Sequence, residues 1–507
     1  MSFPVSPLTE GETPVGPIAP RMYASDKPSV EGITYTSSLR AKVLRGGAWL
    51  GGGSVAEQAT RFARNMVLAR LLAPGAFGTM AVVLSSSSVV DSLLDVGMMQ
   101  AVIQNPRGGE DTYLNAAWWL AMGRAICVYV CVFAMAPWLS RFYGNAELSP
   151  LLRVALLSTL LSSAMSPRAI LAVKDMSFAR WAAIMNGGGI CGVALTVILS
   201  FFVRDVWALA IGYCGENAFR CLLSYVIYPS FPSPKLDRTA MRDLLKFSRG
   251  VLGLSLLNLI FTRADIFVLA KLYSPAALGL YTMAVYLVLT PSGFLVNLLS
   301  QTSLPALSKV QEDKERMNRI LVELTSWLIL LGLPAVVFIC LCGPSLLTIA
   351  YGARYATAAG ALAVASVVVF VNVLNAQITF VFCAAGRPEL HRRGVAATAA
   401  TMLITVYPAC KYLGLAGGQI AALLAIVVGY FFQVVVVRQL TNLNLFRYGR
   451  AFVRSTVVSA GVLTVCLAAR FLRVATAPAA NVALGIGACV IAYLFYAPAL
   501  ARIKETG

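Results

Sequence analysis

The stretch GGSVAEQATRFARNMVLARLLAPGAFGTMAVVL, residues 52–84, decides the fold of this chain. It predicts an apolar helix that carries Glu57, Arg61 and Arg64, then a turn at Pro74 and a second apolar helix. A charged side chain costs about 2.5–3.5 kcal/mol at the centre of a membrane span. Three charges on one span predict that this helix faces something other than lipid.

The composition places this helix in a membrane. The chain has 507 residues, of which 58% are hydrophobic and 12% are charged. A soluble domain carries about 25% charged residues. Apolar runs of about 20 residues, the length of a transmembrane helix, fill the chain from about residue 46 to 501. We therefore predict an all-α polytopic membrane protein.

The residue types argue against nucleic-acid binding, against a disulfide framework, and against metal or enzyme chemistry. The net charge is +19, but the basic residues are scattered over short loops and form no patch for nucleic acid. The eleven cysteines lie mostly inside apolar runs, where cysteine acts as a small buried hydrophobe. With one histidine in the chain, we expect no metal site, no cofactor and no enzyme active site.

The apolar runs predict about 14 transmembrane helices, which form two parallel six-helix lobes around a central cavity plus two C-terminal helices. Their predicted limits are 46–69, 78–104, 113–139, 150–173, 180–202, 206–229, 247–270, 277–304, 321–342, 357–385, 395–412, 414–437, 452–470 and 480–500. The predicted divisions are a disordered cytoplasmic tail (1–45), an N-lobe (46–229), a cytoplasmic inter-lobe loop (230–246), a C-lobe (247–440), and the last two spans with a short cytoplasmic C-terminus (441–507).

The two lobes follow from an internal repeat. LARLLAPGAFG at 68–78 returns as LAKLYSPAALG at 269–279, with six of eleven positions identical. The similarity continues as TMAVVL (79–84) and TMAVYL (282–287). Six predicted spans separate the copies, so both have the same orientation in the membrane. Parallel repeats of this kind predict two lobes related by an axis along the membrane normal, with a cavity between them.

The orientation follows from the loops. Lysine and arginine concentrate in the loops on the side of the N-terminus and are sparse in the alternate loops. Cytoplasmic loops carry this excess in membrane proteins. We therefore predict that both termini are cytoplasmic.

Charged residues recur inside the predicted spans, and most of them lie at helical spacing. Glu57, Arg61 and Arg64 share one face of the first span, as do Glu216 and Arg220 on the sixth. Other charges inside the predicted spans include Asp91 and Asp95 on the second, Arg124 on the third, Arg153 on the fourth, and Arg263 and Asp265 on the seventh. The last five spans carry no charge well inside the hydrocarbon.

We interpret the arginines as the lining of a cavity for an anionic head group, because guanidinium binds phosphate through paired hydrogen bonds and stays charged. The candidates are Arg61, Arg263, Arg64, Arg124 and Arg220. Arg61 is the first of them, because Arg263 lies near its place in the second repeat. The alternative is that Glu57–Arg61 and Glu216–Arg220 are pairs that neutralise each other within the fold.

Three acidic residues are candidates for ion coupling. Asp91, Asp95 and Glu57 lie in spans where a proton or Na⁺ could bind. The alternative role is to pair with the arginines of the first span.

The ordered set of motifs resembles the Wzx-type polysaccharide flippases of the multidrug/oligosaccharidyl-lipid/polysaccharide exporter superfamily, in particular the exopolysaccharide (colanic-acid-like) branch. The first half carries Arg70-Leu71-Leu72-Ala73-Pro74 with Phe77-Gly78, then Asp95-Val96-Gly97 with Ala101-Val102-Ile103-Gln104; the second carries Arg263-Ala264-Asp265, Leu278-Gly279-Leu280-Tyr281 and Tyr351-Gly352. The resemblance covers about residues 46–440. The long N-terminal tail and the scarcity of charge in the last spans depart from it.

This resemblance implies a transporter of the bacterial inner membrane that works by alternating access. It would move undecaprenyl-pyrophosphate-linked oligosaccharide repeat units from the cytoplasmic to the periplasmic leaflet, with membrane lipid around it. A polysaccharide polymerase and a copolymerase are candidate partners.

Two other members of the same superfamily remain as alternatives. A cation-coupled multidrug antiporter predicts a cavity dominated by acids, and a lipid II flippase predicts loss of viability on deletion. A membrane glycan polymerase or ligase is disfavoured, because the predicted outer loops are short and none combines His, Asp and Arg.

Overall fold

The structure is a computed structural model of the chain. It describes residues 52–53, 55–94, 102–103, 105–175, 177–233, 237–450, 452–453, 460, 464 and 477–490. The predicted tail, the end of the second span with Asp95, most of the thirteenth span and the end of the fourteenth lie outside these residues. Within the described part of the chain, the regular structure consists of helices and contains no strand.

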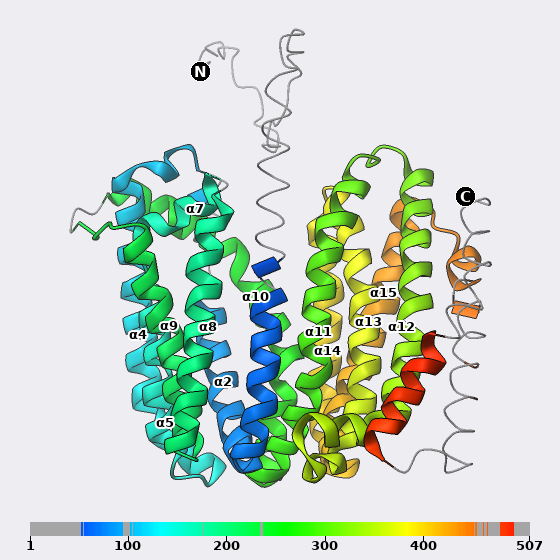
Figure 1. Ribbon diagram of the computed structural model, residues 1–507. Coiled ribbons are helices and arrows are strands. Elements are labelled where there is room, and N and C mark those ends of the chain that lie inside the picture. The colour runs from blue at the N-terminus through cyan, green and yellow to red at the C-terminus, as the bar shows by residue number, and fades with distance from the viewer. Residues whose placement is uncertain are drawn as a thin grey trace, which may run out of the picture. The chain divides into compact units, whose positions relative to one another are not determined.

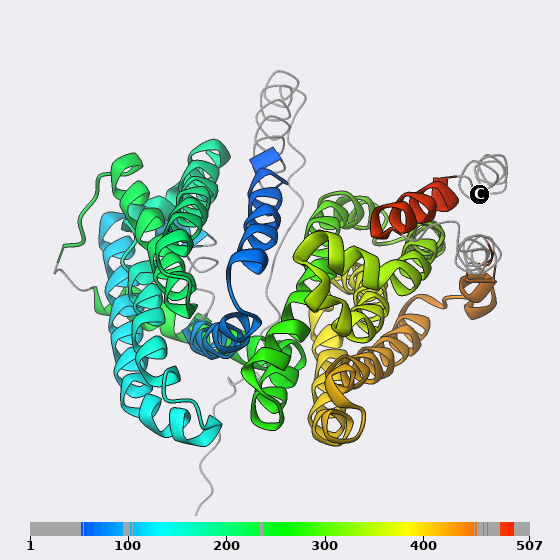
Figure 2. The same cartoon turned by 60° about the horizontal axis from the view of Figure 1, so that its bottom comes forward.

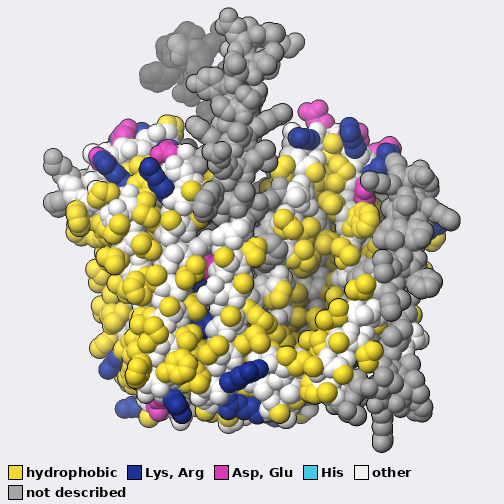
Figure 3. Space-filling model, viewed as in Figure 1, with side chains coloured by type: hydrophobic (Ala, Val, Ile, Leu, Met, Phe, Trp, Pro, Cys, Tyr) yellow, Lys and Arg dark blue, Asp and Glu magenta, His cyan; other side chains and the backbone are white. Residues whose placement is uncertain are grey.

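The predicted class of an all-α membrane protein is confirmed. Six of the described helices are long and apolar enough to cross a membrane, and a seventh crossing results if one bent pair forms a single span. This finding does not establish the predicted number of fourteen. Hydrophobic side chains cover the visible flank, and lysine and arginine gather at its two ends (Figure 3).

In the N-terminal half, the first long helix that the structure describes covers residues 55–71. The helices that follow are α2 (Pro74–Leu94), η1 (Pro106–Gly109), α4 (Asp111–Tyr143), α5 (Leu148–Ala155), α6 (Leu157–Ser163), η2 (Pro167–Ile170), α7 (Leu171–Lys174), α8 (Phe178–Phe202) and α9 (Val206–Ile227).

The C-terminal half contains the longer helices. They are α10 (Arg238–Leu272), α11 (Pro275–Ser308), α12 (Lys314–Tyr351), η3 (Ala353–Ala358), α13 (Ala359–Ala384), α14 (Pro388–Tyr412), η4 (Gly414–Ala416) and α15 (Gly417–Thr441). A further helical segment covers residues 478–490.

Helices α4, α5, α8 and α9 lie together on one side, and α11 to α15 lie on the other (Figures 1 and 2). The helix 55–71, α2 and α10 run between these two groups (Figures 1 and 2).

Local sequence explains where these helices begin. Asp205, Asp237, Ser274 and Asp313 each accept a hydrogen bond from a backbone N–H of the helix that follows. These side chains satisfy donors that the first turn of a helix leaves unpaired. Proline follows Ser274 at the first position of α11, where its missing N–H costs nothing.

The predicted span 150–173 is not one straight helix. It is divided into Leu148–Ser163 and Pro167–Lys174, with a bend of 70° between them. Ser166 has an extended ψ of 128° directly before Pro167. Proline excludes the helical conformation from the residue before it, and this local rule overrides the apolar pattern.

Helix α10 joins the two halves through its packing. Its first turns place Ala240 and Leu244 in an apolar cluster with Tyr113 and Leu114 of α4. Near its end, Leu269 belongs to a larger cluster that includes residues of α2, α5, α9, α11, α13, α14 and α15. One helix is therefore fixed to the N-terminal half at one end and to both halves at the other.

Candidate functional site

A cavity of about 260 Å³ lies between the two halves of the chain. Its walls come from the helix 55–71, α2, α8, α9 and α11, and its lining combines amides, hydroxyls and charges with apolar side chains. The polar lining residues are Gln58, Arg61, Arg64, Asn65, Thr196, Tyr213, Glu216, Thr282, Tyr286 and Thr290. We call this the central cavity.

Four charged residues at its edge form one network. Arg61 forms ion pairs with Glu57 (2.9 Å) and with Glu216, which lies on α9. Arg220 forms ion pairs with Glu216 (2.8 Å) and Glu57 (3.3 Å), and also donates to the backbone oxygen of Met185 (3.2 Å). Two acids and two bases therefore cancel, as the alternative interpretation of these residues expects.

Glycines on α8 make room for this network. A Cβ on Gly188 would lie 2.4 Å from the Arg220 side chain, and one on Gly192 would lie 2.4 Å from Glu216. A Cβ on Gly189 would lie 2.9 Å from a carboxylate oxygen of Glu57. The sequence NGGGICG at 186–192 therefore lets the side chains of the network pack directly against the backbone of α8.

Arg64 differs from Arg61 and Arg220 in its bonding partner, which is an amide and not a carboxylate. It lines the central cavity, and its guanidinium donates to the side-chain oxygen of Asn65 at 3.2–3.3 Å. Among the described residues, no carboxylate forms an ion pair with it. Glu216 is the one acid in the lining, and it is paired with Arg61 and Arg220. The charge of Arg64 is thus not cancelled by a direct partner in the cavity.

Arg263 lies elsewhere, in a smaller cavity of about 110 Å³ between α10, α11, α13 and α15. Buried Asp265 shares this cavity and accepts hydrogen bonds from Tyr281 and Gln419, the latter at 3.4 Å. Its other carboxylate oxygen has no hydrogen-bond partner among the described residues. Thr282 and Tyr286 of α11 line both cavities.

The remaining candidates are not among the lining residues of these cavities. Arg124 is half-buried on α4 and is absent from the lining of the central cavity. Asp91 is exposed on α2, and Asp95 lies outside the described residues. Glu57, the third candidate for ion coupling, is held in the four-residue network.

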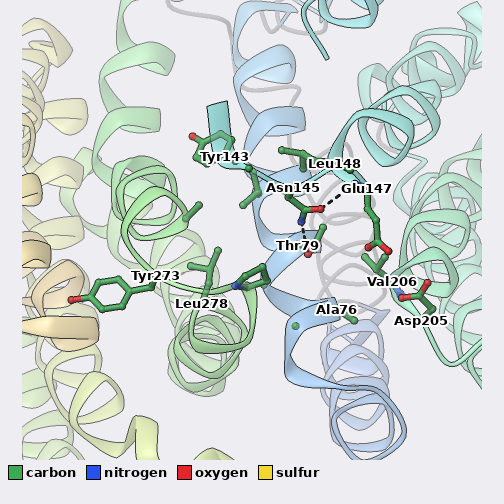
Figure 4. Close-up of a pocket in the computed structure, with 17 residues that line it drawn as sticks. Ala76, Thr79, Tyr143, Asn145, Glu147, Leu148, Asp205, Val206, Tyr273 and Leu278 are labelled. Atoms are coloured by element: carbon green, nitrogen blue, oxygen red, sulfur yellow. Dashed lines mark hydrogen bonds between the residues drawn. The ribbon is translucent and has the colours of Figure 1, made fainter. Parts of the chain in front are cut away.

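A third pocket, of about 540 Å³, lies where α2 and α11 begin and α4 ends. Figure 4 shows Asn145 in this pocket, where its amide donates to the Thr79 hydroxyl (3.3 Å) and accepts from the Glu147 backbone N–H (3.1 Å). Tyr273 and Leu278 line it from the C-terminal half, and the Tyr273 ring points away from Asn145 (Figure 4), with its hydroxyl donating to the carbonyl oxygen of Cys410 (2.9 Å). This pocket marks the end of the molecule at which the two repeats meet.

Several lining residues were not among the sequence candidates. Tyr286 is the position at which the repeated TMAVYL differs from TMAVVL, so comparison of the copies could have identified it. Thr282 and Thr290 had no such signal, because hydroxyls are common in membrane helices and carry no charge. The glycines of α8 were visible as a run, but their contacts depend on helices far apart in the sequence.

The fold is that of a known class of membrane transporters. A solved structure described as "Lipid II flippase MurJ, inward closed conformation" superposes with a TM-score of 0.72 at 12% identity, over 88% of this chain and 98% of that one. An inward-facing multidrug resistance MATE family transporter of the MOP superfamily gives 0.57 at 15% identity, over 76% and 96% of the two chains. At these identities the likeness shows the fold alone.

The sequence gives the family. The profile of the family described as "Polysaccharide biosynthesis protein" matches residues 67–360, more than half of the chain, and the protein belongs to this family. Among its relatives is the lipopolysaccharide biosynthesis protein WzxC of Escherichia coli K12, 23% identical over 320 residues, or 63% of this chain and 65% of that protein. The succinoglycan biosynthesis transport protein ExoT of Rhizobium meliloti is 22% identical over 57% of this chain and 58% of its own length. Each alignment thus spans less than two thirds of the relative.

Proposed function

We propose that this protein is a flippase that moves undecaprenyl-pyrophosphate-linked oligosaccharide units across the bacterial inner membrane, from the cytoplasmic to the periplasmic leaflet, for exopolysaccharide or O-antigen synthesis. The observation that carries the proposal is Arg64, a cation in a cavity between the two halves that bonds to an amide and, among the residues the structure describes, to no carboxylate. An anionic head group supplies the missing charge. The family and the names of the relatives support polysaccharide synthesis as the process served.

In this proposal Arg64, the pair of Arg61 and Arg220, and Arg263 have three different roles. Arg64 binds the pyrophosphate, for which a planar guanidinium offers two parallel hydrogen bonds. Arg61 and Arg220 hold the helix 55–71 against α9 through Glu57 and Glu216, and they reach the substrate if the network rearranges. Arg263 binds the head group in a later state, because it lines a separate, smaller cavity.

The neutral part of the cavity fits a sugar. Gln58, Asn65, Thr282 and Thr290 offer amides and hydroxyls to sugar hydroxyl groups. The aromatic rings of Tyr213 and Tyr286 add amphipathic surface beside them. The polyprenyl chain stays in the surrounding lipid, and rocking of the two halves exposes the cavity on the other side of the membrane. Asp91, Asp95 and Glu57 remain the proposed residues for ion coupling.

A cation-coupled multidrug antiporter is the second candidate, since such transporters share the fold. The lining argues against it, because two arginines accompany a single acid that is already paired. A lipid II flippase is the third candidate, and the fold similarity alone does not distinguish it.

The deciding experiment is deletion of the gene followed by extraction of the membrane lipids. The proposal expects a polyprenyl-pyrophosphate oligosaccharide to accumulate and polysaccharide export to stop, with both restored by the unchanged gene. Accumulation of lipid II with loss of viability would favour a lipid II flippase. Drug hypersensitivity with normal polysaccharide would favour the antiporter, and either result overturns the proposal.

A further inference from the structure

The two copies of the repeat meet each other in space. A Cβ added to Gly78 at the start of α2 would lie 1.8 Å from the carbonyl oxygen of Pro275. A Cβ added to Gly279 at the start of α11 would lie 1.8 Å from the carbonyl oxygen of Pro74. Real Cβ atoms essentially never approach within 3.0 Å. Each copy therefore packs its glycine directly against the proline carbonyl of the other copy.

The basic residue of each copy also crosses to the other half of the chain. Arg70 donates to the carbonyl oxygen of Ile349 (2.8 Å), in the last turn of α12. Lys271, which occupies the same place in the second copy, donates to the carbonyl oxygen of Phe142 in the last turn of α4. The two contacts correspond: Arg70 reaches from the N-terminal half to the C-terminal half, and Lys271 reaches from the C-terminal half to the N-terminal half.

The accepting carbonyl oxygens of Phe142 and Ile349 lie in similar surroundings, because each is in the last turn of a helix that ends in the same way. Helices α4 and α12 both end at a Tyr-Gly pair, Tyr143-Gly144 and Tyr351-Gly352, with positive φ angles of 66° and 107° at the glycines. The glycine N–H groups bond to other residues of the last turn, and neither takes the carbonyl that the cation reaches. A cation at this position satisfies an unpaired carbonyl and opposes the negative end of the helix dipole.

We propose that these contacts form a two-fold lock that holds this end of the transporter, the predicted outer end, closed. The lock consists of Gly78, Gly279, Arg70 and Lys271 with the backbone groups they contact. Both glycine contacts and both cation contacts join the two halves, so an opening that separates the halves here breaks all four together. Loss of the cations then favours the open state without removing any residue of the central cavity.

Arg354 strengthens one side of the lock. It lies in η3, directly after the end of α12, and donates to the carbonyl oxygens of Ala69 and Leu72 (2.9 Å for Leu72). These carbonyls lie at the end of the helix 55–71, so Arg70 and Arg354 tie the same two helix ends together in opposite directions. Position 146 follows Gly144 as Arg354 follows Gly352, but it holds alanine. The lock is therefore stronger on the side of α12.

A disulfide across the closed end tests the lock directly. A Cβ on Gly75 would lie 3.9 Å from the backbone nitrogen of Ala276, so the pair Gly75→Cys and Ala276→Cys places two thiols on neighbouring positions across the junction. The full-length protein in proteoliposomes is treated with a mild oxidant, and the rate of the new disulfide is followed by peptide mass spectrometry. The single variants Gly75→Cys and Ala276→Cys identify any disulfide formed with a native cysteine.

We expect this disulfide to form readily and to stop transport until it is reduced. Addition of Arg70→Gln and Lys271→Gln should lower its rate by roughly two- to fivefold for each cation, the range expected for a charge at an exposed helix end. Arg70→Lys should retain most of the rate. Arg204→Gln is the matched control, because Arg204 is an exposed basic residue on the same predicted side and forms no ion pair or hydrogen bond within the described residues.

An unchanged disulfide rate in the double glutamine variant would overturn the lock. So would a pair that forms no disulfide in protein that is folded by gel filtration. Gly78→Ala provides an independent variant, for which the lock requires the rate to fall because the added methyl separates the helices. The lock rests on the alternating-access part of the proposed function. Because the disulfide is read without substrate, its failure leaves the flippase proposal standing, and the deletion experiment tests that proposal separately.

Discussion

Arg61 and Glu216 lie 155 positions apart in the sequence and form an ion pair between the helix 55–71 and α9. Glu216 is 4% exposed, and it also pairs with Arg220. The charge that made the first helix unsuitable for lipid is therefore balanced inside the protein. Arg64, one turn further along the helix, is left to face the central cavity with an amide as its hydrogen-bond partner.

Arg64→Gln should abolish or strongly reduce polysaccharide export while the amount of folded protein stays normal. The substitution removes the cation that the head group needs, and a hydrogen bond to a charged group contributes about 1.5–3 kcal/mol, or roughly 10- to 150-fold in affinity. Arg64→Lys keeps the charge but loses the paired geometry, so it should export at an intermediate rate. Export per molecule of membrane protein is the measurement.

Arg204→Gln is the matched control for this variant and should export normally. Normal export from Arg64→Gln at normal protein levels would contradict the assignment of Arg64 to the head group.

Arg61→Ala should reduce stability as well as export. Removal of one partner of a buried ion pair costs about 3–5 kcal/mol, and the 26% exposure of the Arg61 side chain places the expected loss at or below the lower end of that range. The unfolding temperature in detergent is the measurement. The double variant Arg61→Ala with Glu216→Gln should lose less than the sum of its single variants, because the second change removes the unpaired charge. Additive losses would show that the two side chains are not coupled.

Gly192→Ala should destabilise the protein by about 1–3 kcal/mol, the usual cost of overpacking. The added Cβ would lie 2.4 Å from the Cβ of Glu216 and 2.6 Å from its Cα, so the backbone of α9 must move. Gly123→Ala on α4 is the control, since a Cβ there has nothing within 4 Å. That control should be neutral or slightly stabilising, by up to about 1 kcal/mol, through its helix propensity. Equal unfolding temperatures for the two variants would refute the packing role of α8.

Asp237, at the start of α10 and outside the predicted spans, gives a pH-dependent test. The Thr239 hydroxyl, the backbone N–H groups of Thr239 and Ala240, and Arg107 lower the pKa of Asp237 to about 2. Because this pKa lies below the ordinary value, the contribution of the carboxylate is complete above about pH 4 and is lost as the pH falls towards 2. The difference in unfolding temperature between the unchanged protein and Asp237→Asn should be constant from pH 7 to pH 5 and should shrink at pH 3. The same difference at pH 3 and pH 7 would contradict this role.

The candidate site was predictable in part. The charges at 57, 61 and 64 stand out because any charge in an apolar span is costly, and their spacing places them on one face. Which of them faces the cavity was not predictable, because Glu216 and Arg220 reach the first helix from α9, more than 150 residues later. The near equivalence of Arg61 and Arg263 in sequence did not place them in one cavity: Arg61 lines the central cavity and Arg263 lines the smaller one.

The sequence by itself determined the class of this protein, since the length and apolarity of its helices and its internal repeat are local properties of the chain. Only the tertiary structure decided which charges cancel and that Gly78 meets Gly279. The physical reason is that an ion pair or a backbone contact depends on distances between helices, and these distances result from the packing of the whole bundle.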